Sequence, residues 1–275
     1  MGTMLEDVHL FVLAHPDDEI AFAPLLGRLA RERKVVRLIY LTDGAAGGQS
    51  PAVRAAESRA ALEYLGVARK GACFAGKDAG LPDGQLHLHL DRALDALEEW
   101  SRPWAGIASI YSFAWEGGHP DHDAALAVAA AFATRRGLID RVWEAPFYRA
   151  SDRLPPPLFT YRSMLPANGE IMTVALSASE RRLPPAVLRF YRSQWRTFVG
   201  LAPMVLWSSL TKSTFELQRL DISRLFERPT ARKLLYEYRY GLAFDEFALA
   251  IAPFIKAHLR DGEKAPAHVK RAGTA

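Results

Sequence analysis

Short apolar runs alternate with segments of helical periodicity through the first 150 residues. Mostly apolar runs occupy positions 8–14, 35–42, 106–113 and 141–148, and a shorter run surrounds Cys73. Their length and their β-branched and aromatic content predict buried strands. The segments between them are long enough for helices, which is typical of a parallel sheet covered on both faces with right-handed connections. We therefore expect an α/β fold with a Rossmann-like, doubly wound, mostly parallel sheet.

The alternation of apolar runs and helical segments ends after Tyr148, where a proline-rich connection begins. The residues that follow predict an edge strand over 170–177, a helix over 184–199 that starts with proline, and helices over 203–219 and 230–259, the last broken near Gly241. We expect residues 1–150 to form the core, 151–260 to form a largely helical extension packed on it, and 261–275 to form a flexible tail.

Composition excludes several classes of protein. The chain has 275 residues, 49% of them hydrophobic, so a single large domain with a substantial core is expected. Its 35 basic and 31 acidic residues are interspersed, without the basic block that follows nucleic-acid phosphates. No run approaches the roughly 20 apolar residues of a membrane span, and no export signal is evident. We expect a cytoplasmic protein that binds no nucleic acid, and its one cysteine allows no internal disulfide.

Two polar clusters follow predicted strands. "AHPDDE" (14–19) comes after the first strand, and "EGGHPDHDA" (116–124) comes after the strand over 106–113. Ligands of open parallel sheets bind at the carboxyl ends of the strands, where the strand order reverses. If the order is 3-2-1-4-5, the two clusters face each other across one crevice. Carboxylates there would repel a dinucleotide pyrophosphate and attract a cation.

Imidazole and carboxylate groups from both loops would suit a catalytic zinc ion, which keeps one position open for water. Hydrolysis also requires a base that is not itself a ligand. The clusters contain more polar groups than the ion needs. We expect one of the acidic residues that does not bind the ion to accept and donate protons during the reaction.

These motifs resemble the PIG-L/LmbE-like N-acetylglucosaminyl deacetylase family, zinc enzymes that hydrolyse the N-acetyl group of amino sugars and glycoconjugates. The resemblance rests on "AHPDDE", on "LTDG" after the second strand, on "RAAESRAALEYLG" in the next helix and on "HPDH" in the distal loop. It extends over roughly residues 8–150. The remainder resembles the portion in which family members differ.

The resemblance implies a role for each matching residue. His15, Asp18 and His122 would bind the metal, and Asp17 would act as the general base. His119 would stabilise the oxyanion and assist proton delivery to the leaving amine. Zinc is the expected ion, although iron or cobalt suits the same ligands.

Other polar residues have two interpretations. Asp43 is a candidate for substrate contact or for the turn after the second strand. The resemblance implies that Arg54 and Glu57 lie on a helix face that contacts substrate, and their i, i+3 spacing equally suits a surface ion pair. Glu19 either orients a ligand histidine or favours the helix dipole in the first turn. Asp121 is expected only to cap its helix.

Two further sets of residues are assigned structural roles. Asp78 and Asp83 in "GKDAGLPDG" are expected to be turn residues. Trp115 is expected in the core rather than in a sugar-binding wall. The aromatic C-terminal third is expected to cap the sheet edge, with a lid over a large glycoconjugate as the alternative.

The sequence therefore predicts a metal-dependent hydrolase that removes the N-acetyl or N-acyl group of an amino sugar or glycoconjugate. Two alternatives remain: a metal-dependent amidase acting on a non-sugar N-acyl substrate, and a non-catalytic carbohydrate-binding protein. The sequence leaves the oligomeric state and the particular substrate open.

Overall fold

The computed structural model describes residues 7–104, 106–151 and 158–259. The predicted flexible tail lies outside these residues. Within them, one sheet has the strand order β3-β2-β1-β4-β5-β9-β8. Its parallel part consists of β1 (Val8–Leu13), β2 (Val35–Tyr40), β3 (Ala72–Cys73), β4 (Ile107–Phe113) and β5 (Val142–Ala145). The predicted fold class and the predicted adjacency of the first and fourth strands are confirmed.

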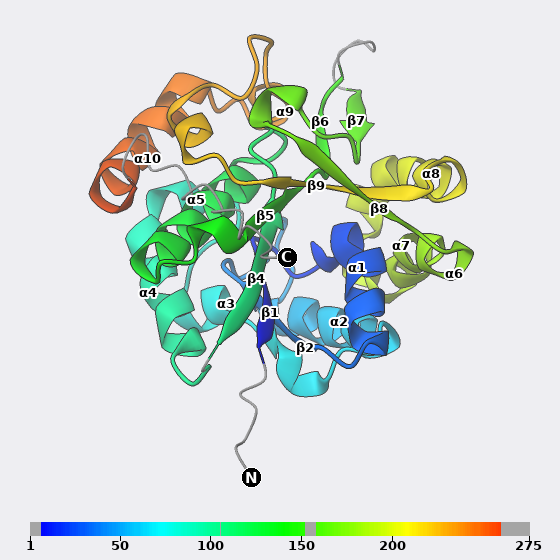
Figure 1. The fold of residues 1–275 in the computed structure, drawn as a ribbon. Helices are drawn as coiled ribbons and strands as arrows, with labels where there is room; N and C mark the ends of the chain where they lie inside the picture. The colour runs from blue at the N-terminus through cyan, green and yellow to red at the C-terminus, as the bar shows by residue number, and fades with distance from the viewer. Residues whose placement is uncertain (1–6, 105, 152–157, 260–275) are drawn as a thin grey trace, which may run out of the picture.

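Helices cover both faces of this sheet (Figure 1). The first half of the chain supplies α1 (Glu19–Arg31), α2 (Pro51–Tyr64), α3 (Ala75–Ala79), α4 (Leu90–Ser101) and α5 (Pro120–Arg135). Side chains of β1 alternate between the two layers, because successive residues of a strand point to opposite faces. Leu10 and Val12 pack in the cluster that includes α4 and α5, and Phe11 and Leu13 pack in the cluster that includes α1.

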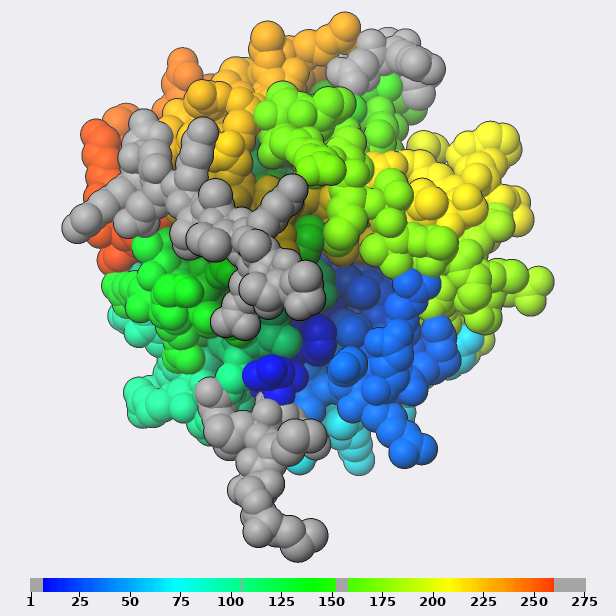
Figure 2. Space-filling view, viewed as in Figure 1, coloured from blue at the N-terminus to red at the C-terminus, as the bar shows by residue number. Residues whose placement is uncertain are grey.

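The second half of the chain adds strands and helices around this core. It comprises β6 (Tyr148–Ala150), β7 (Phe159–Tyr161), β8 (Ile171–Ala175), β9 (Thr214–Arg219), α6 (Ala178–Arg181), α7 (Leu183–Val187), α8 (Trp195–Thr211), α9 (Leu235–Arg239) and α10 (Phe244–His258). In both whole-molecule views α8 (yellow) and α10 (orange to red) lie on opposite sides (Figure 2). Residues 120–133 of α5 are all buried, and α10 packs in the same cluster.

Two predicted helices are wrong in part. The segment Thr214–Arg219, predicted as the end of a helix, is β9, which pairs antiparallel with both β5 and β8. The predicted helix over 184–199 is interrupted because Tyr191 has φ −98° and ψ 63°, outside the helical region. The predicted edge strand is β8, and the predicted break near Gly241 separates α9 from α10.

Within the described part of the chain, every helix is too short or too polar to span a bilayer. The cytoplasmic location stays a prediction.

Candidate active site

The two histidine-containing loops meet at the carboxyl ends of β1 and β4, which are parallel neighbours. His122 at the start of α5 places its Nε2 3.1 Å from Oδ1 of Asp18. The ring centroids of His15 and His122 lie 5.3 Å apart. Residues separated by more than 100 positions in the sequence therefore surround one point.

His15, Asp18 and His122 each offer a ligand atom within 4.8 Å of the others, and all three residues are buried. Oδ2 of Asp18 accepts hydrogen bonds from the backbone amides of Ala14 (2.9 Å) and His15 (2.7 Å), which leaves Oδ1 to face the histidines. The side chain makes no cap for α1. Two imidazoles and a carboxylate in a buried site fit the donor set of a catalytic zinc ion.

Electrostatics maintains the charge of Asp18. Burial disfavours the ionised carboxylate, but the neighbouring His122 and His15 hold the pKa of Asp18 below its ordinary value. The carboxylate is therefore available as an anionic ligand.

Asp121 orients His15 rather than capping its own helix, which corrects the sequence-based expectation. Its Oδ2 lies 3.1 Å from Nε2 of His15 and accepts a hydrogen bond from the amide of Gly84 (2.6 Å), while Oδ1 accepts from the amide of Leu86 (3.0 Å). A carboxylate behind a ligand imidazole fixes its ring orientation and its tautomer. The start of α5 is instead capped by His119, whose Nδ1 accepts from the amide of Asp121.

Asp17 has a constrained backbone and lies beside the candidate metal ligands. Its φ of 142° is rare for a residue other than glycine. Its amide donates to Oε2 of Glu19 (3.1 Å), and its Oδ2 accepts from Nη1 of Arg54 (3.2 Å). Burial raises the pKa of Asp17, and the positive charge of Arg54 opposes that rise. The result is a positioned carboxylate with increased proton affinity.

Glu19 supports the backbone of Asp17 instead of orienting a ligand histidine. It lies in the first turn of α1 and is fully buried, and its Oε1 accepts a hydrogen bond from the hydroxyl of Tyr191. Burial raises the pKa of Glu19 to about 7. Because Tyr191 belongs to the C-terminal half, that half helps to hold the "AHPDDE" loop.

His119 is arranged as a neutral hydrogen-bond donor. Burial and the nearby His15 lower the pKa of His119 to about 3. Since Nδ1 accepts a hydrogen bond, the neutral ring carries its proton on Nε2. The ring packs edge-on against His15 (4.7 Å between centroids) and against Tyr240 (4.8 Å).

The residues predicted to contact substrate are placed differently from one another. Arg54 is buried, lines the site and pairs with Asp17, so its predicted surface ion pair with Glu57 is wrong. Glu57 accepts hydrogen bonds from the amide (2.8 Å) and hydroxyl (2.5 Å) of Ser193. Asp43 accepts from the amides of Ala45 and Asp83, both at 3.0 Å, and positions these two loops.

Asp83 belongs to the site, although the sequence suggested only a turn. Its Oδ1 lies 3.1 Å from Nε2 of His15, and it forms a second group of potential ligands with His15 and His119. The loop that carries it reaches the same point because Asp43 binds its backbone.

A cavity of about 280 Å³ opens at these groups, and we call it the histidine cavity. Its remaining walls come largely from the C-terminal half and from aromatic residues that sequence reasoning did not assign to the site, including Phe147, Tyr148, Thr197, Phe198, Leu201 and Tyr240. Trp115 lies in the core, as predicted. The extension therefore shapes the space available to a ligand.

Comparison with known proteins assigns residues of the core to a family. Residues 10–133 match the PIG-L family model, described as GlcNAc-PI de-N-acetylase. These residues form a PIG-L family domain. The match confirms the predicted family and, with it, the predicted enzyme class, an N-deacetylase. No curated protein is significantly similar to the chain.

Solved structures share the fold over most of the chain. The A40926 pseudoaglycone deacetylase is 16% identical, with a TM-score of 0.54 over 79% of this chain and 99% of that one. A zinc-inhibited form of teicoplanin deacetylase is 17% identical, with a TM-score of 0.56 over 78% and 99%. A deacetylase–teicoplanin complex is 18% identical, with a TM-score of 0.52 over 78% and 99%. At these identities the likeness establishes the fold.

Proposed function

We propose that the protein is a metal-dependent hydrolase that removes the N-acetyl group of an amino sugar or glycoconjugate. The observation that carries this proposal is the meeting of His15, Asp18 and His122 around one point, with Asp17 held beside them by Arg54. Three ligands with a separate carboxylate suit hydrolysis, whereas a purely structural site would need no such carboxylate. The deacetylase family match supports a sugar-derived substrate, as do the A40926 pseudoaglycone deacetylase and teicoplanin deacetylase of similar fold.

The proposed reaction gives each of these side chains one role. His15, Asp18 and His122 would hold the ion, which supplies polarisation of the acetyl carbonyl and of water. Asp17 accepts a proton from the attacking water, and its raised pKa favours that step. The Nε2–H of His119 donates a hydrogen bond to the carbonyl oxygen as negative charge develops there. Cleavage of the C–N bond releases acetate, and the amine nitrogen takes up the proton that Asp17 accepted.

Zinc is the ion we propose, because two imidazoles and one carboxylate with an open position are typical of its catalytic sites. Iron or cobalt would fit the same donors. Elemental analysis of the purified protein identifies which is bound.

The decisive experiment measures bound metal and acetate release from N-acetylglucosamine derivatives for two variants. Asp17→Asn is expected to keep one equivalent of metal and to lose turnover by about 100-fold or more. His122→Ala is expected to lose the metal. His258→Ala and Asp78→Asn serve as controls, because these residues lie outside the histidine cavity. Full activity in Asp17→Asn, or full metal content in His122→Ala, contradicts the proposal.

The same assay separates the alternatives. Hydrolysis of N-acyl amino acids in preference to N-acetyl sugars identifies a non-sugar amidase. Metal and sugar binding without acetate release identifies a carbohydrate-binding protein.

A further inference from the structure

The helix α8 carries a row of large apolar side chains on its outer surface. These are Trp195 (61% exposed), Val199 (66%), Leu206 (51%) and Leu210 (73%), which we call the outer row. Their spacings place them on one face of the helix, because an α-helix completes a turn about every 3.6 residues. Isolated exposed apolar residues are ordinary, whereas a contiguous row indicates an interaction surface.

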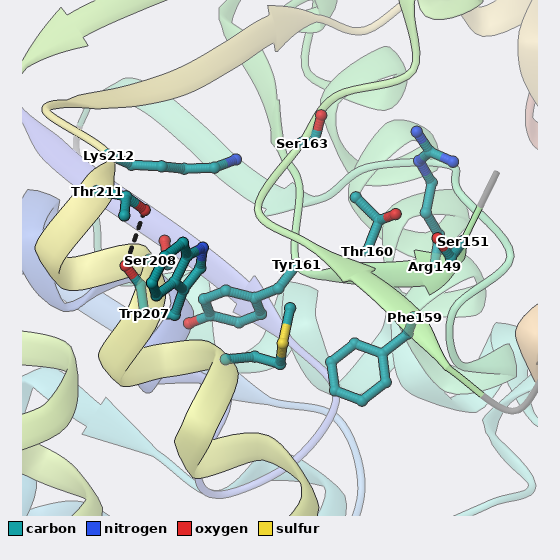
Figure 3. Close-up of a pocket in the computed structure, with 11 residues that line it drawn as sticks. Arg149, Ser151, Phe159, Thr160, Tyr161, Ser163, Trp207, Ser208, Thr211 and Lys212 are labelled. Carbon is teal, nitrogen blue, oxygen red and sulfur yellow. Dashed lines mark hydrogen bonds between the residues drawn. The ribbon is translucent and has the colours of Figure 1, made fainter. Parts of the chain in front are cut away.

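The opposite face of α8 packs on the rest of the molecule. Phe198, Leu201 and Val205 are buried in the core cluster that includes α1. Near the end of the helix, Ser208 and Tyr161 of β7 line a cavity between these two elements (Figure 3). In Figure 2, α8 (yellow) lies at the edge of the molecule. Packing therefore uses one face of the helix and leaves the outer row exposed.

The charge around the outer row is positive. Residues 181–215 contain five arginines and one lysine, without any aspartate or glutamate. Two of the arginines, Arg192 and Arg196, are exposed close to Trp195 in the sequence, and the guanidinium of Arg196 lies 5.4 Å from the centroid of the Trp195 ring. Neither arginine forms an ion pair with a described residue. The apolar row is therefore accompanied by two cations whose charge is not neutralised.

Neighbouring elements bring three carboxylates toward this part of the chain, and each is engaged elsewhere. The pairs are Glu57 with the amide and hydroxyl of Ser193, Glu180 with Arg28 and Arg31, and Glu216 with Lys212. Because Glu216 offsets the charge of Lys212, we count only Arg192 and Arg196 as cations available to a partner.

This combination distinguishes between possible partners. A second copy of the chain, joined through the outer row, would bring a surface of the same positive charge against the first, which opposes association. A bilayer with anionic headgroups suits both features. The apolar face of an interfacial helix enters the boundary between headgroups and acyl chains, and its arginines contact the headgroups. Tryptophan is enriched at the same boundary.

We propose that the outer row, with Arg192 and Arg196, docks the protein on a membrane surface that contains anionic lipids. The residues of α8 that line the histidine cavity, among them Thr197 and Leu201, do not belong to the outer row. Docking and the proposed reaction therefore use different faces of the helix, and docking is testable without any turnover.

Vesicle binding tests the apolar part of the surface. The full chain is sedimented with phosphatidylcholine vesicles that contain phosphatidylglycerol. The double variant Val199→Ser with Leu210→Ser is expected to bind about 30-fold more weakly than the original protein, with an unchanged Tm because both side chains are exposed. Leu249→Ser is the matched control, since Leu249 is 77% exposed on α10, on the opposite side of the molecule. No binding by the original protein, or an equal loss in the control, overturns the proposal.

The same assay tests the charge. Arg192→Gln with Arg196→Gln is expected to weaken binding to the anionic vesicles about 30-fold and to leave the weak binding to pure phosphatidylcholine unchanged. Arg69→Gln with Lys70→Gln removes two exposed cations outside residues 181–215 and is the control. Equal binding of the original protein to both kinds of vesicle would overturn the role of the arginines.

Fluorescence and sedimentation separate a bilayer from a second copy of the chain. Lipids brominated near the headgroup are expected to quench the original protein, and Trp195→Phe is expected to reduce this quenching, whereas Trp100→Phe, which removes an exposed tryptophan of α4, is not. Analytical ultracentrifugation without lipid is expected to show no association through the outer row. A dimer that Val199→Ser with Leu210→Ser abolishes would overturn the proposal and identify a second copy as the partner.

Discussion

The substitution Asp121→Asn tests whether the residues behind the ligands determine metal binding. The carboxylate of Asp121 is fully buried and accepts from the amides of Gly84 and Leu86, with Nε2 of His15 at 3.1 Å. Asparagine has the same shape, but one of its two terminal groups is a donor. Whichever way the amide is turned, its NH2 group faces at least one backbone N–H that now lacks an acceptor.

The expected magnitudes follow from those contacts. Loss of a hydrogen bond to a charged group, with a buried donor left unpaired, costs about 2 kcal/mol of folding free energy, or a decrease in Tm of about 6 °C. Loss of the carboxylate that orients His15 lowers metal affinity about 10- to 100-fold.

Metal affinity is measured by competition with a chromophoric chelator, and Tm by calorimetry of the metal-free protein. Asp78→Asn is the control, since Asp78 is exposed. Unchanged metal affinity in Asp121→Asn would refute the role we assign to this residue, even if the variant is less stable.

Two further predictions concern Glu180 and Arg54. Glu180 is buried and binds Arg28 and Arg31, and hydrogen bonds from Arg28 hold its pKa below the ordinary value of 4.5. The ionised Glu180 therefore stabilises the fold above pH 4.5, and this stabilisation is lost as the pH falls. Glu180→Gln is expected to lower the free energy of unfolding by about 3 kcal/mol at pH 7, with a smaller difference at pH 3. A difference in chemical denaturation that does not change with pH contradicts this. Arg54→Met releases the side chain of Asp17 and is expected to lower kcat about 100-fold, while the protein keeps its full metal content. An unchanged kcat in steady-state kinetics would show that the ion pair between Arg54 and Asp17 does not contribute to catalysis.

Local signals predict the core of the fold and the ligand group. Strand and helix periodicity in the first half fixes a parallel sheet, and the right-handed connections limit its strand order. The motifs around His15 and His122 follow two strands that this order makes neighbours. The proximity of His15 and His122 therefore follows from the strand order alone.

Long-range pairing decides the features that sequence reasoning missed. Thr214–Arg219 becomes a strand because β5 and β8 offer hydrogen-bonding edges on both sides, which its own composition does not reveal. In the sequence Asp83 is indistinguishable from an ordinary turn aspartate. Its place beside His15 depends on the hydrogen bond from its backbone amide to Asp43, which is 40 positions away. Tyr191 reaches Glu19 across 172 positions, a contact without a local signal.

The most direct test of the account is anomalous X-ray diffraction at the zinc absorption edge from crystals of the zinc-loaded protein. The account predicts an anomalous peak within about 2.0–2.3 Å of nitrogen atoms of His15 and His122 and of an oxygen of Asp18, with the carboxylate of Asp17 outside the coordination sphere. A zinc ion bound elsewhere, or one that takes Asp17 as a ligand, would contradict it.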